Sequence, residues 1–115
     1  MKNKTFIKSV WCAIRGLGYA LKTEKNYRYY ILIYTLTLLV NIYFKVEFTC
    51  YIVQLLATMG VFASECLNTS IEHISDLITK ELNYEIKIIK DIAAGSVLCW
   101  GIAYFTCEIL FILKG

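Results

Sequence analysis

Four polar side chains recur in the middle of the chain at steps of three, four and four residues: Glu65, Asn68, Glu72 and Asp76. This spacing places all four on one side of an α-helix. Carboxylates in or near hydrocarbon are costly, so this acid stripe needs protein, water or cations as partners. Oxygen ligands of this kind suit Mg²⁺, which keeps several waters and usually shares its other positions with phosphate. The acid stripe therefore predicts a surface that binds positive charge.

The acid stripe also has a simpler interpretation, in which its carboxylates pair with the lysines that follow it in the chain. This alternative applies best to Asp76, near the end of the stripe, and least to Glu65, which is deepest in an apolar segment. Lys90 could bind phosphate or anchor its helix at a membrane surface. His73 has no second histidine or cysteine at ligand spacing, so we interpret it as an interface residue rather than a metal ligand.

The chain that positions these side chains is short, apolar and at most one domain. It has 115 residues, of which 58% are hydrophobic and 18% charged, with no proline, and its mean hydropathy is +0.58. Ordinary soluble domains are about 45–50% apolar, and a chain this short has too little interior to bury so much apolar surface. Much of it must face lipid, which argues against a soluble enzyme or a disordered tail. The five cysteines include no Cys-x-x-Cys pair, so we read them as small apolar side chains.

Three uncharged runs predict three transmembrane helices. They contain sixteen, seventeen and sixteen residues and begin at positions 29, 48 and 92. Each is slightly shorter than the about 18–20 residues that cross a bilayer, but flanking residues can extend a helix to the interface. We expect spans at about residues 29–45, 48–77 and 92–113. Tyr29 and Tyr30 are expected in the aromatic belt at one membrane surface.

An amphipathic helix is expected at about residues 4–24, before the first span. Apolar residues recur there at steps of three or four from Phe6 to Leu21, while lysine and arginine occupy another face. The helix could lie in the headgroup plane of anionic lipid or pack on a partner protein. Because the interruptions by charge are too frequent for the core of a signal peptide, we expect the helix to be retained.

The distribution of basic residues predicts the orientation in the membrane. Seven lysines or arginines precede the first span, Lys2 and Lys4 among them. The positive-inside rule then places the N-terminus in the cytoplasm and the C-terminus outside. The end of the acid stripe and a loop over residues 80–91 are expected at the cytoplasmic surface, where nucleotides are available. No phosphate-binding glycine loop or protein-kinase signature is present, so spacing alone does not identify a reaction.

Three motifs follow one another along the chain. They read Ala20-Leu21-Lys22-x-Glu24-x-Asn26-x-Arg28, then Glu65-x-x-Asn68-Thr69-x-Ile71-Glu72-x-x-x-Asp76, then Lys90-Asp91-x-Ala93-Ala94-Gly95. In this order and with these spacings, the chain resembles the prokaryotic diacylglycerol kinase and undecaprenol kinase family over nearly its whole length. The resemblance implies an all-α integral membrane protein with an N-terminal amphipathic surface helix and three transmembrane helices. It also implies a homotrimeric helical bundle in the bacterial cytoplasmic membrane, with active sites shared between neighbouring subunits.

The resemblance implies a reaction in which the γ-phosphate of ATP passes to a lipid hydroxyl in the presence of Mg²⁺. Glu65 would be the general base near the lipid hydroxyl, and Asn68 would support it. Glu24 and Glu72 would hold the magnesium ion. The nucleotide contacts that the resemblance implies are Glu24, Glu72, Glu81, Lys90 and Asp91. Phosphoryl transfer needs mainly positioning, charge neutralisation and one proton acceptor, and these residue types can supply all three.

Two departures from the family pattern leave the adenine and ribose contacts open. Glu81-Leu82-Asn83 stands where many relatives have Glu-Tyr-His, and Cys12 stands where a tyrosine is common in the surface helix. The first and third motifs are more similar to the Gram-positive branch, which phosphorylates undecaprenol. We therefore expect a kinase for undecaprenol, with diacylglycerol as the alternative substrate, because hydrophobic contact discriminates lipid tails weakly.

The rival hypothesis from another class is a small proton-coupled exporter. Such a protein typically needs one isolated acid deep in the bilayer and a fourth span, whereas this chain has several acids near one surface and room for three spans. The partners that we expect are a membrane lipid alcohol, ATP, the bilayer and further copies of the chain. Nucleic acid is not expected among them.

Overall fold

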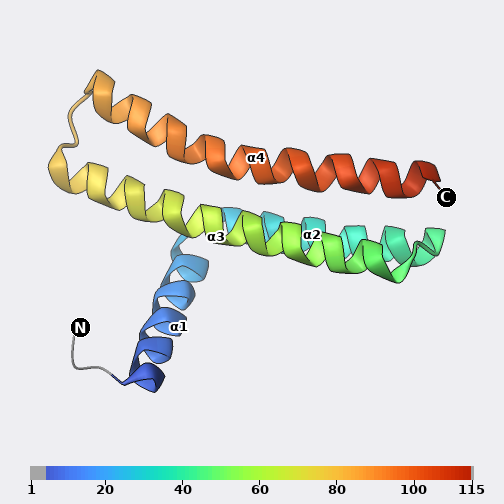
Figure 1. The fold of residues 1–115 in the computed structure, drawn as a ribbon. Helices are drawn as coiled ribbons and strands as arrows, with labels where there is room; N and C mark the ends of the chain where they lie inside the picture. Colours follow the sequence, from blue (N-terminus) through green and yellow to red (C-terminus); the bar gives the residue numbers. More distant parts are fainter. Residues whose placement is uncertain (1–4, 115) are drawn as a thin grey trace.

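The computed structural model describes residues 5–114, and all regular secondary structure in this range is helical (Figure 1). The helices are α1 (Phe6–Thr23), α2 (Asn26–Phe44), α3 (Phe48–Ile78) and α4 (Tyr84–Lys114). The prediction of an all-α protein is therefore confirmed. Lys2 and Lys4, which contributed to the predicted orientation, lie outside the described residues, and Lys4 is also where the surface helix was expected to begin.

α1 leaves the side of the other helices at a steep angle (Figure 1). It begins after Thr5, whose Oγ1 accepts a hydrogen bond from the backbone N–H of Lys8 at 3.3 Å, as an N-cap residue does. The apolar side chains of α1 are not covered by the rest of the chain, since Phe6 is 83% exposed and Trp11 61% exposed. This uncovered face fits both expected locations of the helix, a lipid surface and a partner protein.

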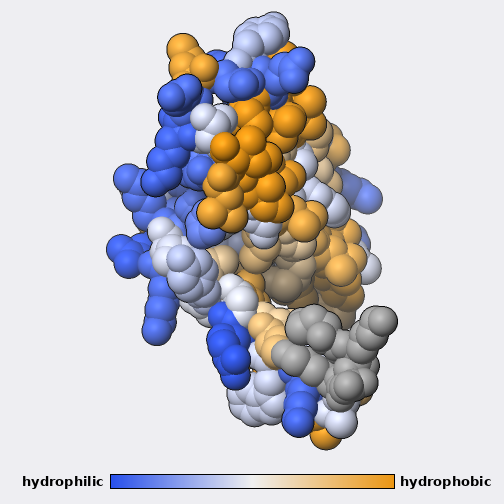
Figure 2. Space-filling view, turned by 90° about the vertical axis from the view of Figure 1, so that its left-hand side faces the viewer, coloured by the Kyte–Doolittle hydropathy of each residue, from blue (hydrophilic) through white to orange (hydrophobic). Residues whose placement is uncertain are grey.

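α3 is the central helix, because it lies side by side with α4 and also contacts α2 and α1 (Figure 1). Its buried positions are small or polar: Gln54, Ala57, Thr58, Val61, Ser64, Glu65, Asn68, Thr69 and Ser75. Large apolar side chains of α2, α3 and α4 mostly face outward, and Figure 2 shows a broad hydrophobic surface beside a hydrophilic edge. A soluble protein has the reverse distribution. Small and polar residues between helices with apolar residues outside are typical of a bundle in lipid.

Two of the helices are long and apolar enough to cross a membrane, namely α3 and α4, each with 31 residues. They correspond to the second and third expected spans. α2 has 19 residues and carries five tyrosines, whose hydroxyl groups lower its apolar character. Its expected role as a further span therefore remains a prediction.

α4 begins eight residues earlier than the third expected span, at Tyr84 instead of residue 92. The expected loop over residues 80–91 was therefore wrong for most of its length. Asn83 is the local reason, because its side-chain Oδ1 accepts a hydrogen bond from the backbone N–H of Ile86 at 3.1 Å and so satisfies a free donor of the first turn. Lys87 and Asp91 add an ion pair of 2.6 Å at helical spacing.

α3 and α4 approach each other closely where Gly60 meets the indole ring of Trp100. A Cβ atom at Gly60 would collide with ring atoms of Trp100, so the absence of a side chain is what lets the ring lie against the backbone of α3. Close approach at a small residue is a usual device for packing helices in membranes, where dispersion rather than the hydrophobic effect joins them. We expect this contact to contribute to the alignment of α3 and α4, together with the hydrogen bonds between the two helices.

A group of buried polar residues joins α2, α3 and α4 toward the C-terminal end of α4. We call Asn41 of α2, Gln54 of α3 and Glu108 of α4 the Glu108 cluster. Gln54 Nε2 donates to Glu108 Oε1 at 3.0 Å and to the carbonyl oxygen of Tyr104 at 3.1 Å. With its amide nitrogen toward the carboxylate, Asn41 donates to both carboxylate oxygens of Glu108. Asn41 is fully buried and Gln54 nearly so, so these amides hold a carboxylate that lipid alone would not solvate.

Candidate functional site

Glu65 lies on the buried side of α3, and only 2% of its surface is exposed. Its Oε2 atom accepts a hydrogen bond of 2.9 Å from the hydroxyl group of Tyr30 on α2. Its Oε1 atom is also buried, but it has no hydrogen-bond partner among residues 5–114. A buried acceptor without a partner is costly. The second oxygen of this carboxylate is therefore available to a donor that the described chain does not supply.

Asn68 and Glu72 continue the same side of α3 toward its C-terminal end. Asn68 Nδ2 donates to Glu72 Oε1 at 3.3 Å. The side-chain oxygen of Asn68 is buried and, within the described part of the chain, has no hydrogen-bond partner. Glu65 and Asn68 thus present two acceptor atoms on one side of α3 that residues 5–114 do not satisfy.

Glu24 reaches the acid stripe from the other end of the chain. It follows α1 directly, where its backbone N–H donates to the carbonyl oxygen of Ala20 at 2.9 Å. Glu24 lies close enough to Glu72 for their charges to interact, although no hydrogen bond or ion pair joins the Glu24 side chain to the acid stripe within residues 5–114. We call Glu24, Glu65, Asn68 and Glu72 the carboxylate cluster.

Tyr27 and Tyr30, both on α2, hydrogen-bond to α3 in the turn that leads to Glu65. The hydroxyl of Tyr27 donates to the carbonyl oxygen of Phe62 at 3.2 Å, and the two rings pack edge to face with centroids 5.3 Å apart. This contact fastens the corner between α1 and α2 to α3, one turn before Glu65. Tyr30, one turn further along α2, then reaches Glu65 itself.

The placement of Tyr30 in an aromatic belt stays a prediction, and the structure adds a contact that the sequence did not reveal, because the Tyr30 hydroxyl group donates to the buried carboxylate of Glu65. Tyr29, its neighbour, is 59% exposed. A signal was present in the sequence: residues able to hydrogen-bond recur along α2 at steps of three and four, in the order Tyr27, Tyr30, Tyr34, Thr37 and Asn41. This spacing marks the side of α2 that faces the other helices.

Lys90 lies beside the carboxylate cluster and is paired with the last residue of the acid stripe. Its Nζ atom donates to Asp76 Oδ1 at 3.0 Å, across the hairpin of α3 and α4. Its charge also acts favourably on Glu72. For Asp76, the simpler interpretation as the partner of a lysine is therefore the observed one, although both side chains remain partly exposed.

Glu81 and Asp91 are not joined to the carboxylate cluster by any hydrogen bond or ion pair within residues 5–114. Glu81 is exposed in the connection between α3 and α4, where its backbone N–H donates to Thr79 Oγ1 at 3.0 Å. Asp91 forms its ion pair with Lys87, one turn earlier on α4, and both side chains are 63% exposed. Of the seven predicted site residues, Glu65, Asn68 and Glu72 share one side of α3. Glu24 and Lys90 lie within range of the charge of Glu72, whereas Glu81 and Asp91 are bonded elsewhere.

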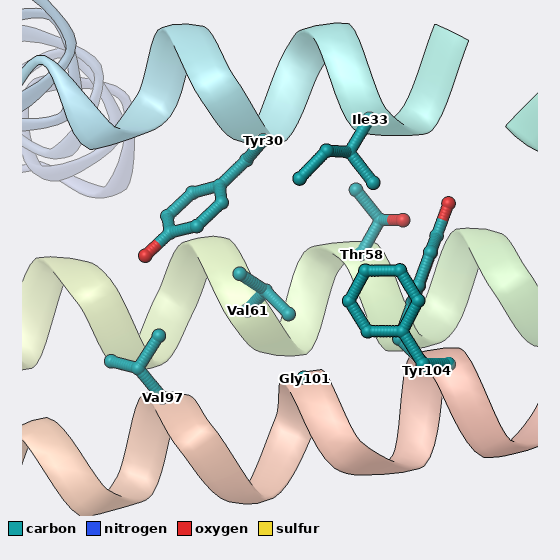
Figure 3. Close-up of a pocket in the computed structure, with 8 residues that line it drawn as sticks. Tyr30, Ile33, Thr58, Val61, Val97, Gly101 and Tyr104 are labelled. Atoms are coloured by element: carbon teal, nitrogen blue, oxygen red, sulfur yellow. The ribbon is translucent and has the colours of Figure 1, made fainter. Parts of the chain in front are cut away.

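An apolar groove begins at Tyr30 and runs between α2, α3 and α4 (Figure 3). The groove is open along part of its surface, and the space within it, open solvent included, is about 440 Å³. Figure 3 shows the Tyr30 hydroxyl at one end of the groove and Tyr104 toward the other. The remaining lining residues are Ile33, Thr58, Val61, Val97, Gly101 and Phe105. The ring of Tyr30 thus borders an apolar groove while its hydroxyl group binds the buried carboxylate.

Comparison with known proteins identifies the family. Residues 11–112 match the sequence model of the family described as prokaryotic diacylglycerol kinase. The chain belongs to this family. Members of the prokaryotic diacylglycerol kinase family are lipid kinases, which transfer a phosphoryl group to an alcohol acceptor and use ATP as co-substrate. The predicted enzyme class is confirmed, and the exporter hypothesis is set aside.

Two relatives of this lipid kinase carry different substrate names. The chain is 32% identical over 97 residues to undecaprenol kinase of Bacillus subtilis (strain 168). The aligned region covers 84% of this chain and 79% of that protein. It is 33% identical to diacylglycerol kinase of Synechocystis sp. over 89 residues. Here the aligned region covers 76% of this chain and 51% of that protein. No solved structure matches the chain.

The carboxylate cluster of this lipid kinase fits a metal ion that arrives with a nucleotide, and not a self-contained metal site. In the part of the chain that the structure describes, no three histidine, cysteine or acidic side chains are arranged to hold a metal ion. Mg²⁺ in kinases is usually bound by one or two protein carboxylates, with phosphate oxygens and water as the other ligands. Glu24 and Glu72 repel each other when ionised, and a cation between them would relieve that repulsion.

Proposed function

We propose that this lipid kinase transfers the γ-phosphate of ATP to the hydroxyl group of undecaprenol and so produces undecaprenyl phosphate. Glu65 carries the proposal for the reaction, because it is a buried carboxylate with one oxygen held by Tyr30 and the other without a partner in the described chain. The choice of undecaprenol is supported by the match to the Bacillus enzyme, which covers more of both chains than the match to the Synechocystis enzyme.

Glu65 acts as the general base in this reaction. The hydroxyl proton of the lipid passes to Glu65 Oε1 while the hydroxyl oxygen forms a bond to the γ-phosphorus. The bond from that phosphorus to the β–γ bridging oxygen breaks, and ADP leaves with the electron pair. Such a transfer depends on alignment and on neutralisation of charge more than on covalent help from the protein. Asn68 supports Glu65 and offers an amide group at the transferring phosphoryl group.

Glu24 and Glu72 would hold Mg²⁺ together with the phosphates of ATP. The metal ion, when bound, neutralises charge on the β- and γ-phosphates. Lys90, whose charge acts favourably on Glu72, would contact the phosphates as a point charge. Glu81 and Asp91 remain proposed nucleotide contacts. In a homotrimer with shared sites, they would act on a carboxylate cluster in the same chain or in a neighbouring one.

The proposed arrangement in the membrane brings the carboxylate cluster close to one membrane surface. We place α2 across the bacterial cytoplasmic membrane beside α3 and α4, with the N-terminus in the cytoplasm and the C-terminus outside. The carboxylate cluster then lies just below the cytoplasmic headgroups, where it is accessible to ATP from water and to the alcohol group of a lipid. The apolar groove beside Tyr30 offers a place for hydrocarbon next to Glu65.

Diacylglycerol is the second candidate substrate, because the Synechocystis relative named for it is as similar in identity as the Bacillus relative. Purified protein in mixed micelles is given labelled ATP, Mg²⁺ and either undecaprenol or dioleoylglycerol at equal mole fraction, with Glu65→Gln as the control. Preferential labelling of undecaprenol supports the proposal. Preferential labelling of dioleoylglycerol replaces the substrate, and no labelled lipid from either would refute the kinase function.

A further inference from the structure

Tyr30 is the one side chain within residues 5–114 that hydrogen-bonds to Glu65. Its hydroxyl group donates to Oε2 at 2.9 Å, whereas Oε1 has no partner there. A terminal carboxylate rotates easily about its last side-chain bond. The donor from Tyr30 distinguishes two oxygens that would otherwise be equivalent, because it occupies one of them.

The ring of Tyr30 packs against two other aromatic rings, which restrict where its hydroxyl group can lie. It packs edge to face on Tyr27, with centroids 6.1 Å apart, and lies at an angle to Phe62 of α3 at 6.3 Å. Its outer side borders the apolar groove (Figure 3). A tyrosine has few rotatable bonds, so these contacts leave its hydroxyl group little freedom to leave Glu65.

We propose that Tyr30 is a positioning residue, which holds Glu65 Oε2 so that Oε1 alone faces the lipid hydroxyl group. This inference rests on the proposed function of Glu65 as the base. Proton transfer needs the acceptor within hydrogen-bond reach of the hydroxyl that it deprotonates, and a small misplacement of a reacting group costs much of the rate. Tyr30 does not touch the phosphoryl group. It acts through Glu65, and it links the wall of the groove to the reacting end of the lipid.

The test compares Tyr30→Phe with Tyr27→Phe. Both changes remove one hydroxyl group from α2 and keep the ring, but the Tyr27 hydroxyl binds a backbone carbonyl of α3 rather than Glu65. Because a hydrogen bond to a charged group is worth more than a neutral one, we expect Tyr30→Phe to lower kcat about ten- to a hundredfold. We expect KM for ATP and for lipid to stay within about twofold, and Tyr27→Phe to keep kcat within about threefold.

A double-mutant cycle with Glu65→Gln shows whether Tyr30 acts through Glu65. If it does, adding Tyr30→Phe to Glu65→Gln has no further effect on kcat, since effects of residues that act as a unit are not additive. Equal losses in Tyr30→Phe and Tyr27→Phe, a change confined to KM, or full additivity in the cycle would overturn the inference. A wild-type protein without lipid kinase activity would instead overturn the proposed function, so the two failures are distinct.

Discussion

Lys90 and Asp76 form an ion pair of 3.0 Å that connects α4 to α3 beside the carboxylate cluster. The lysine that we propose as a phosphate contact therefore already has an anionic partner. Both side chains are partly exposed, 36% for Lys90 and 52% for Asp76, so the pair contributes little to stability. ATP has to compete with Asp76 for the same ammonium group.

Asp76→Asn is therefore expected to strengthen the binding of ATP. The change frees Lys90 and also removes a negative charge near the phosphates, so KM for ATP should fall about two- to threefold, while the unfolding temperature changes little. Lys90→Ala should raise KM for ATP. Steady-state kinetics at fixed Mg²⁺ excess check both variants, and an increase of KM in Asp76→Asn would contradict the role given to Lys90.

Glu65→Gln should abolish most turnover and leave the fold intact. The substitution keeps the size and the hydrogen-bonding capacity of the side chain but removes the proton acceptor, and a general base typically contributes about a hundred- to ten-thousandfold. Binding of ATP, measured separately by equilibrium dialysis, should stay near the wild-type value. Turnover within tenfold of wild type would exclude Glu65 as the base.

Glu72→Ala and Glu24→Ala should each shift the Mg²⁺ dependence of the reaction. Either change removes one of the two carboxylates proposed to hold the ion, so half-maximal activity should require several-fold more Mg²⁺. Glu85→Ala is the matched control, because Glu85 is an exposed acid in the first turn of α4. An unchanged Mg²⁺ titration in both cluster variants would count against the proposed metal site.

Glu108→Ala should destabilise the protein without altering its chemistry. The change leaves the buried amides of Asn41 and Gln54 without their acceptor, which costs about 1–3 kcal/mol for an unsatisfied buried group. Gln54 and Glu65 are separated by roughly 16 Å along α3 at 1.5 Å per residue, so kcat at low temperature should be retained. Thermal unfolding in detergent checks the first expectation, and Glu108→Gln should show a smaller loss.

Gly60→Val should also destabilise the protein, for a steric reason. Any side chain at this position collides with the indole ring of Trp100, and overpacking of this kind typically costs about 1–3 kcal/mol. Trp100→Leu in the same chain should restore part of the stability, because the smaller side chain leaves room. If the double variant is no more stable than Gly60→Val, then α3 and α4 are not aligned by this contact.

The helical class, the membrane character and the acid stripe could all be predicted from the chain without a structure. Total apolar content shows that a short chain cannot bury its surface from water. Spacing of three and four residues shows which side chains share a helix face. Both depend only on composition or on local periodicity, so Glu65, Asn68 and Glu72 could be grouped before any contact was known. Glu24 and Lys90 joined them through a resemblance of motifs rather than through spacing.

The contacts between helices could not be predicted in this way. Tyr30 and Glu65 are 35 residues apart in sequence, and the same tyrosine at the end of an apolar run is equally suited to a membrane surface. The start of α4 at Tyr84 depended on a cap from Asn83, because a charged segment is compatible with a loop or with an exposed helix. In the sequence, Glu108 only marks the end of an uncharged run. In the structure, the side-chain amides of two other helices donate hydrogen bonds to its carboxylate. Local spacing determines the face of a helix that a residue occupies, but the packing of distant segments determines what that face meets.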